Sequence, residues 1–327
     1  MTIPDWAIVP NQRDGVCTYV WGAKGMGGKF SVHGLRLTVR GALYYRSVNL
    51  SPLICQTFSP HRFDAHMEKA LSGQTAIVTG VSRNRGIGAA ICRSLAEAGA
   101  NIFFTSWQPY DRSIGSGDEP GFPEKLVQEL QQNDVQADWL EIDLSGPLAP
   151  QQTIEIVNAR FGSSHILVNN ACFSIQDDYL TIDSSNLDQS YAINIRAPIL
   201  LSAAFVREFK GRGARRIVSM TSGQSLGPMP GTLSYASTKG GIEAFTLTFA
   251  AEVASFGITV NALDPGPTDT GWMTEEMRTQ LSQRFPTGRV NTPEDAAAVV
   301  RFLVSNGADT ITGQLIRARG GFADTHN

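Results

Sequence analysis

The sequence predicts a doubly wound α/β domain, in which helices cover both faces of a seven-stranded parallel sheet. From Thr75 onward, short apolar runs alternate with longer stretches of helical pattern. The runs are continuously apolar, as expected for strands that are buried on both faces. Alternation of strands and helices implies right-handed crossovers, which place the strands parallel to one another. A glycine-rich turn after the first run lies where such sheets bind ligands.

Seven strands are expected, one in each apolar run. They are Thr75–Thr79, Asn101–Thr105, Asp138–Ile142, His165–Asn169, Arg216–Met220, Thr259–Leu263 and Gln314–Arg317. The helices expected between them are Ala89–Ala98, Glu124–Asn133, Pro150–Arg160, Leu187–Phe209, Tyr235–Ser255 and Pro293–Ser305.

The first 66 residues differ in character from the rest of the chain. They hold seven basic residues and three acidic ones, with scattered glycines and no persistent helical or alternating period. We interpret residues 1–66 as a poorly structured extension, and residues 67–327 as a single domain. This leading hypothesis includes a mis-called gene start, in which translation begins at Met67. A genuine appended element and a targeting segment remain alternatives.

Composition limits the classes of function. Apolar residues make up 42% of the chain and charged residues 17%, which is typical of globular proteins. A formal net charge of -3 argues against a nucleic-acid partner. The apolar runs are shorter than the roughly 18 residues of a membrane-spanning helix. The four cysteines lie far apart, so we expect no metal site and no disulfide framework, and a reducing, cytoplasmic location. They are Cys17, Cys55, Cys92 and Cys172.

The glycine-rich turn runs from Gly80 to Gly88 and leads into an alanine-rich helix. Glycines let backbone N–H groups approach a pyrophosphate closely, and the N-terminus of the following helix attracts the same anion. Such a turn by itself also occurs for packing reasons. Its position after the first strand of a βαβ unit favours a dinucleotide, as in the Rossmann fold.

The end of the second strand discriminates between the two nicotinamide cofactors. NAD-specific domains carry an acidic residue there, which binds the ribose 2′-hydroxyl. The segment Phe103–Trp107 contains no acidic residue, whereas Arg83 and Arg85 lie in the glycine turn. Arginine suits a 2′-phosphate. We therefore expect NADP(H) rather than NAD(H), the alternative being that both arginines are merely solvated.

Tyr235 and Lys239 lie four residues apart at the start of a long apolar helix. This spacing brings the ammonium of the lysine toward the phenol of the tyrosine. A nearby cation favours the phenolate, so we expect the pKa of Tyr235 to fall below its ordinary value near 10. A lowered pKa would make proton exchange feasible. The pair alone has a bland alternative, namely a buried tyrosine beside an exposed lysine.

Several motifs occur together in a fixed order, and Ser222 precedes Tyr235 by 13 residues. With them, roughly residues 70–323 resemble the short-chain dehydrogenase/reductase family, in its Tyr-x-x-x-Lys branch. The motifs are Thr79-Gly80 with Gly86-Ile87-Gly88, Asp143-Leu144, Asn169-Asn170-Ala171, Asn194, Ser222, Tyr235 with Lys239, and Pro265-Gly266 with Thr270.

The resemblance implies a role for each matching residue. Tyr235 would exchange a proton with the substrate oxygen, and Ser222 would hydrogen-bond that oxygen. Lys239 would hold the nicotinamide ribose and lower the pKa of Tyr235, while Asn194 would anchor a water that links Lys239 to solvent. Tyr235 and Lys239 thus also belong to the cofactor-binding set, whose other members are Gly80, Ser82, Arg83, Arg85, Gly86, Ile87, Gly88, Asp143, Leu144, Asn170, Ala171, Pro265, Gly266, Thr268 and Thr270.

Three features depart from the family pattern. Five residues separate Gly80 from Gly86, where the family usually has three, so the turn must bulge. Cys172 stands where the family usually has glycine, and we interpret it as a small buried thiol. A long polar loop spans Trp107–Pro123, and we interpret it as a surface insertion rather than a cover for the adenosine end.

Substrate contacts are expected from three loops, Ser174–Tyr179, Gln224–Thr232 and Thr268–Pro286. Trp272, Met273 and Met277 would face inward as a lid, or pack as ordinary helix residues. The resemblance favours a carbonyl reductase, similar to 3-oxoacyl-[acyl-carrier-protein] reductases, in which NADPH delivers hydride to a carbonyl carbon and the reverse reaction oxidises the secondary alcohol. The substrate would be a small carbonyl or alcohol compound, for example an acyl thioester.

Two other functions remain open. A non-catalytic NADP(H)-binding regulator is disfavoured because the chain keeps all four catalytic residue types. An enoyl reductase is an option because a lengthened glycine turn also occurs in that branch, but it is disfavoured because that branch spaces its tyrosine and lysine more widely. By resemblance, the helices Leu187–Phe209 and Tyr235–Ser255 would form a homodimer or homotetramer, with no nucleic-acid or membrane partner.

Overall fold

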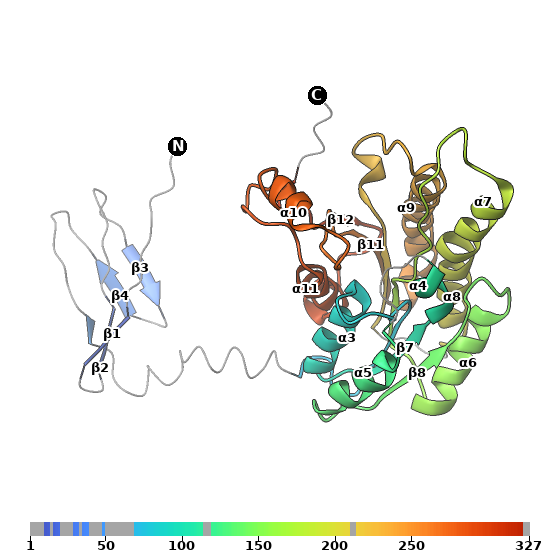
Figure 1. The fold of residues 1–327 in the computed structure, drawn as a ribbon. Coiled ribbons are helices and arrows are strands. Elements are labelled where there is room, and N and C mark those ends of the chain that lie inside the picture. Colours follow the sequence, from blue (N-terminus) through green and yellow to red (C-terminus); the bar gives the residue numbers. More distant parts are fainter. Residues whose placement is uncertain are drawn as a thin grey trace. The chain divides into compact units, whose positions relative to one another are not determined.

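The computed structural model describes residues 69–113, 119–209 and 214–322 and, before them, the backbone of five short strands (Figure 1). The chain divides into two units, Met1–Met67 and Glu68–Asn327.

The first unit contains antiparallel strand pairs. A three-stranded sheet has the order β1-β2-β5, and β3 pairs with β4. The strands are β1 (Pro10–Arg13), β2 (Val16–Tyr19), β3 (Lys29–Val32), β4 (Leu35–Thr38) and β5 (Val48–Asn49). Strands of two to four residues are too short to produce a visible alternating period. The prediction of a poorly structured extension otherwise falls on residues outside the described ones.

The second unit contains the predicted seven-stranded sheet, in the order β12-β11-β10-β9-β6-β7-β8. Every neighbouring pair is parallel. The strands are β6 (Thr75–Val78), β7 (Asn101–Ser106), β8 (Ala137–Glu141), β9 (Ile166–Asn169), β10 (Arg215–Met220), β11 (Ile258–Asp264) and β12 (Leu315–Arg317). Each strand begins and ends within one residue of its predicted range. The structure therefore confirms the fold class.

Helices cover both faces of the sheet (Figure 1). The helices are α3 (Ile87–Glu97), α4 (Gln108–Ser113), α5 (Phe122–Gln131), α6 (Ala149–Phe161), α7 (Ser184–Tyr191), α8 (Ala197–Arg207), α9 (Leu233–Val253), α10 (Glu275–Ser282) and α11 (Pro293–Val304). Alternate residues of β6 point to opposite faces: Ala76 and Val78 pack with α3, α5 and α11, whereas Ile77 packs with α6, α8 and α9.

The predicted continuous helix Leu187–Phe209 is interrupted. A π-helical turn, Ala192–Arg196, separates α7 from α8. Pro198, in the first turn of α8, has no N–H to give to the carbonyl of Asn194, four residues earlier. The helix widens over this stretch instead of continuing in the α geometry. Asn194 therefore lies inside the widened turn.

The strand order reverses between β6 and β9, which are neighbours in the sheet although β7 and β8 lie between them in the chain. Ligands bind in the crevice at such a point. Gly80 follows β6 there with φ of +72°, and a Cβ on it would lie 2.5 Å from Cα of Ala171. Only glycine fits this approach. Within the described part of the chain, no helix is both long and apolar enough to traverse a bilayer.

Candidate active site

A cavity of about 1270 Å³ lies along the carboxyl ends of the strands. Its walls come from the glycine turn after β6, the end of β7, and the loops after β9, β10, β11 and β12. The first turns of α9 close one end. This volume exceeds that of a typical small-ligand pocket, so it accommodates an extended ligand and a second small molecule.

The N-terminus of α3 opens into this cavity through Gly86, Ile87 and Gly88. Within the described residues, no side chain caps this helix, and its first turn contains no acidic residue. The first N–H groups of a helix need hydrogen-bond acceptors, and a ligand bound in the cavity can supply them. The residues present therefore fit a pyrophosphate, as predicted for a dinucleotide.

The lengthened glycine turn closes on itself, because the N–H of Gly86 donates to the carbonyl of Arg83 at 3.1 Å. Asn170, the first residue after the neighbouring strand β9, supports the turn, since its Nδ2 donates to the carbonyls of Thr79 at 2.9 Å and Gly80 at 3.0 Å. The five-residue spacing is thus accommodated by a local turn that leaves the start of α3 in place.

The two arginines of the glycine turn take different positions. Arg83 lies on the cavity wall, with Nε 3.4 Å from Oδ1 of Asp111. Arg85 lies outside the cavity lining and pairs with Asp269, with 3.3 Å between Nη2 and Oδ2. The structure therefore separates the two candidates for the 2′-phosphate by location.

Most of the other predicted cofactor residues line the cavity. These are Gly80, Ser82, Gly86, Ile87, Gly88, Leu144, Asn170, Ala171, Tyr235, Lys239, Pro265, Gly266 and Thr270. Two others do not: Oδ1 of Asp143 accepts the N–H of Ser145 at 2.8 Å, and the hydroxyl of Thr268 donates to the carbonyl of Gly266 at 3.1 Å. Both side chains stabilise loops behind the wall.

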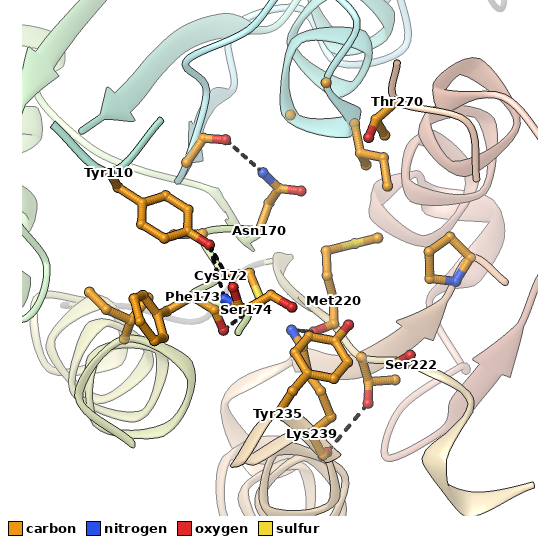
Figure 2. A pocket seen from close by; sticks show the side chains of 18 of the residues that line it. Tyr110, Asn170, Cys172, Phe173, Ser174, Met220, Ser222, Tyr235, Lys239 and Thr270 are labelled. Atoms are coloured by element: carbon orange, nitrogen blue, oxygen red, sulfur yellow. Dashed lines mark hydrogen bonds between the residues drawn. The ribbon is translucent and has the colours of Figure 1, made fainter. Parts of the chain in front are cut away.

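Ser222, Tyr235 and Lys239 gather at one end of the cavity (Figure 2). Nζ of Lys239 lies 5.5 Å from the centre of the Tyr235 ring and donates to the carbonyl of Met220 at 2.9 Å. Lys239 is buried, whereas Tyr235 and Ser222 are half-buried and face the cavity. The helix α9 thus brings together the phenol and the ammonium, and the end of β10 supplies the serine.

Burial raises the pKa of Tyr235 above its ordinary value, although Lys239 acts in the opposite direction. The expected lowering of this pKa is therefore wrong. Removing the phenol from water disfavours its charged form more than one ammonium favours it. Burial alone lowers the pKa of Lys239, but Cys172 and Tyr235 raise it by more. At neutral pH the phenol holds its proton and the lysine is charged.

Asn194 is buried and does not line the cavity. Its Oδ1 accepts the N–H of Phe173 at 2.8 Å, and its Nδ2 donates to the carbonyl of Phe173 at 2.8 Å and to Oγ1 of Thr238 at 3.1 Å. The side chain thus joins the loop after β9 to α9.

Cys172 differs from its predicted place as a buried thiol, because it is half-buried and lines the cavity. Its thiol donates to the carbonyl of Phe173 at 3.5 Å, and its proximity raises the pKa of Lys239. The residue therefore belongs to the environment of the Tyr235–Lys239 pair.

The segment Trp107–Pro123 is not a plain surface insertion. Its helix α4 lines the cavity with Tyr110 and Asp111. The hydroxyl of Tyr110 accepts the N–H of Ser174 at 3.0 Å and lies 3.3 Å from the carbonyl of the same residue (Figure 2). Its ring lies 5.4 Å from that of Phe173. The polar composition of the segment favoured a surface loop and gave no indication of this contact. The aromatic residues Trp107 and Tyr110 at its start were the sequence feature that could have predicted it.

The predicted lid residues separate. Trp272 lines the cavity, and its Nε1 donates to the carbonyl of Thr268 at 3.0 Å. Met273 is buried in a small apolar cluster with Phe285 and Phe322, and Met277 lies outside the cavity lining. Met273 therefore packs at the base of α10 and does not face the cavity.

Sequence reasoning missed Asp177, Asp264 and Arg319. Asp177 is buried and accepts the N–H of Ser234 beside Tyr235 at 3.1 Å. Asp264 and Arg319 form a buried ion pair at the wall of the cavity. The local sequence around each of these residues predicts a strand or a loop and gives no sign of a site. Only the tertiary structure brings the three side chains to the site.

Comparisons with known proteins agree with this geometry. A family model described as enoyl-(acyl carrier protein) reductase matches residues 80–323. The oxidoreductase YjdA of Bacillus subtilis is 45% identical over 76% of this chain and 96% of its own. The 3-oxoacyl-[acyl-carrier-protein] reductase FabG of Pseudomonas aeruginosa is 34% identical over 77% of this chain and 98% of its own.

A solved short-chain dehydrogenase of Burkholderia cenocepacia, in complex with NADP, superposes with a TM-score of 0.68 and is 30% identical. The match covers 77% of this chain and 98% of that one. With the parallel sheet, the glycine turn and the Ser222, Tyr235 and Lys239 cluster, these likenesses identify the chain as an oxidoreductase that belongs to the short-chain dehydrogenase/reductase family.

Proposed function

We propose that this protein is an NADPH-dependent reductase of carbonyl compounds, with 3-oxoacyl thioesters as the leading substrate class. The observation that carries the proposal is one cavity that joins an uncapped helix N-terminus to the Ser222, Tyr235 and Lys239 cluster. The first end suits the phosphates of a dinucleotide, and the second suits a carbonyl oxygen. The FabG relative supports the substrate class.

The residues at the end of the cavity that would hold the adenosine support a preference for NADP(H) over NAD(H). The last residue of β7 is Ser106, not an acidic residue, and Arg83 lies on the adjoining wall. Arginine binds a phosphate with two parallel hydrogen bonds. Asp111 beside Arg83 orients the guanidinium and also opposes a second anion, so the preference depends on the balance between these two side chains. The complex of the Burkholderia relative with NADP supports the same cofactor.

The chemistry assigned to the chain is proton transfer and charge stabilisation. Bound NADPH supplies the hydride. Tyr235 donates its proton to the substrate oxygen, and its raised pKa keeps that proton in place at neutral pH. Ser222 donates a hydrogen bond to the same oxygen, where negative charge develops. Lys239 supplies a fixed positive charge beside the phenol, and Asn194 holds the loop after β9 against α9.

The test is turnover of NADPH by the purified chain with β-ketoesters, 3-oxoacyl thioesters and simple aldehydes. We expect Tyr235→Phe to lower kcat by about a thousandfold, because general acid catalysis contributes roughly 10² to 10⁴. Its affinity for NADPH should be retained. Tyr191→Phe is the matched control, since Tyr191 is exposed on α7. Undiminished turnover in Tyr235→Phe would remove this residue from the mechanism.

Reduction of an enoyl thioester is the second candidate, supported by the description of the matching family model and by the lengthened glycine turn. The spacing of Tyr235 and Lys239 on a single helical turn favours the carbonyl reductase. Enoyl thioesters in the same substrate panel distinguish the two. Tight binding of NADPH with no turnover of any substrate would instead indicate a cofactor-binding regulator.

We also propose a homodimer or homotetramer formed through α7, α8 and α9, in a cytoplasmic location. The exposed apolar residues Leu187 on α7 and Leu247 on α9 support the assembly. The free thiols of Cys92 and Cys172 support a reducing compartment. Light scattering of the purified chain and cell fractionation test these two proposals, and a strict monomer would contradict the first.

A further inference from the structure

A buried ion pair lies at the edge of the active-site cavity. Nη1 of Arg319 lies 2.8 Å from Oδ2 of Asp264, and the two side chains are only 8% and 1% exposed. Asp264 is the last residue of β11, and Arg319 follows the neighbouring strand β12. The pair therefore joins the carboxyl ends of two adjacent strands, where the reacting groups gather.

The guanidinium of Arg319 rests directly on the loop that carries the catalytic serine. A Cβ on Gly223, the residue after Ser222, would lie 2.2 Å from Nη1 of Arg319. On its other side, Arg319 packs on Gly266, where a Cβ would lie 3.0 Å from Cα of Arg319. Two positions without side chains thus leave room for this arginine between the serine loop and the loop after β11.

The carboxylate of Asp264 completes the arrangement. Its Oδ1 accepts the N–H of Gly266 at 2.9 Å, and its Oδ2 accepts from Arg319. Gly266 belongs to the loop whose residues line the cavity beside the predicted nicotinamide position. One ion pair therefore contacts the backbones of both loops that enclose the reacting atoms.

The pair also contributes to the electrostatic environment of Tyr235. Burial is the largest influence and raises the pKa of Tyr235. Lys239 and Ser222 lower this pKa, whereas Cys172 and Asp264 raise it. These groups face the phenol from α9, from the loop after β9, from the end of β10 and from β11. Arg319, after β12, neutralises the carboxylate that would otherwise act on the phenol alone.

We propose that Asp264 and Arg319 are a positioning pair for the reaction. They hold the loop of Ser222 against the loop of Gly266 and balance a buried carboxylate with a buried guanidinium behind Tyr235. Acting through Tyr235 and Ser222, the pair would set the geometry and the charge at the substrate oxygen. This inference rests on the proposed role of Tyr235 as proton donor.

The test is the pH dependence of kcat/KM for carbonyl reduction in Asp264→Asn, Arg319→Gln and the double variant. The alkaline limb is the fall of kcat/KM at high pH, where Tyr235 loses its proton. Asp264→Asn leaves the positive charge of Arg319, which favours the phenolate, so the limb should move to lower pH by about one unit. Arg319→Gln leaves a negative charge, so the limb should move to higher pH. The double variant removes both charges and should return the limb toward its original position.

Thermal melting and NADPH binding are measured for each variant to check folding and cofactor affinity. The double variant removes both charges, so neither partner is left buried without its counter-ion. Asp309→Asn is the matched control, because Asp309 pairs with buried Arg216 at the opposite end of β10. This control should not move the limb. If Tyr235→Phe abolishes turnover but the two single variants shift the limb in the same direction, or not at all, the positioning role is wrong and the proposed function stands. If Tyr235→Phe remains active, the proposed function itself fails.

Discussion

The carboxylate of Asp177 binds the backbone N–H of Ser234, with 3.1 Å to Oδ1 and 3.2 Å to Oδ2. The hydroxyl of Ser234 donates to the same carboxylate. Asp177 is 3% exposed, and Ser234 immediately precedes Tyr235 at the start of α9. A carboxylate from the loop after β9 therefore caps the helix that presents the phenol of Tyr235, in a place where the N-cap residue Thr232 provides no side-chain cap.

Replacing Asp177 should affect both stability and rate. We expect Asp177→Ala to lower the free energy of unfolding by about 1 to 2 kcal/mol, as for the loss of a helix cap. We expect kcat to fall about tenfold as Tyr235 loses its fixed position. Asp183→Ala is the control, since Asp183 caps α7 through Asn186 away from the phenol. Denaturant unfolding and steady-state kinetics measure the two effects; an equal loss of kcat in both variants would show that the cap acts only through stability.

Arg83 and Arg85 should contribute unequally to cofactor choice. Arg83 lies on the cavity wall and Arg85 does not. We expect Arg83→Ala to raise the Kd for NADPH about tenfold or more, because a charge-assisted hydrogen bond to phosphate is worth about 1.5 to 3 kcal/mol. The Kd for NADH should change little. Fluorescence titration with both cofactors measures this, and a larger effect of Arg85→Ala would reassign the 2′-phosphate to the other arginine.

Asp269 links the glycine turn to α10. It pairs with Arg85 at 3.3 Å and with Nη2 of Arg278 at 2.8 Å. Burial alone would raise the pKa of Asp269, but the N–H of Gly271 and the guanidinium of Arg278 lower it below its ordinary value. We expect Asp269→Asn to speed NADPH release about two- to fivefold, the range of one exposed ion pair.

Salt should reduce this difference between the wild-type chain and Asp269→Asn, because added ions screen the exposed Arg85. Stopped-flow release of NADPH at low and high ionic strength provides the measurement. Identical release rates for the two chains at low salt would show that this ion pair does not retain the cofactor.

The raised pKa of Tyr235 predicts how the reaction rate depends on pH in each direction. Below its pKa the phenol carries the proton that reduction consumes, so kcat/KM for reduction should be level through neutral pH and fall as pH rises through that pKa. Alcohol oxidation requires the phenolate and should increase over the same interval. Rates measured in both directions check this; a reduction rate that falls below neutral pH would assign proton donation to another group.

The sequence determined the sheet and the chemical types of the site residues. Apolar runs buried on both faces fixed each strand of the second unit, because such runs are stable only between two layers of helices. The order of Gly80, Ser222, Tyr235 and Lys239 along the chain was sufficient to predict a dinucleotide site beside a phenol. These signals are local or follow a fixed spacing, so they are visible without a structure.

Only the tertiary structure decided what surrounds these residues. Arg85 reaches Asp269 across 184 positions of the chain, and Arg319 reaches Asp264 across 55. The sign of the Tyr235 pKa shift depended on burial, which the four-residue spacing to Lys239 does not reveal. Desolvation and ion pairing depend on the folded distances between groups, and residues distant in sequence acquire those distances only when the strands pack side by side.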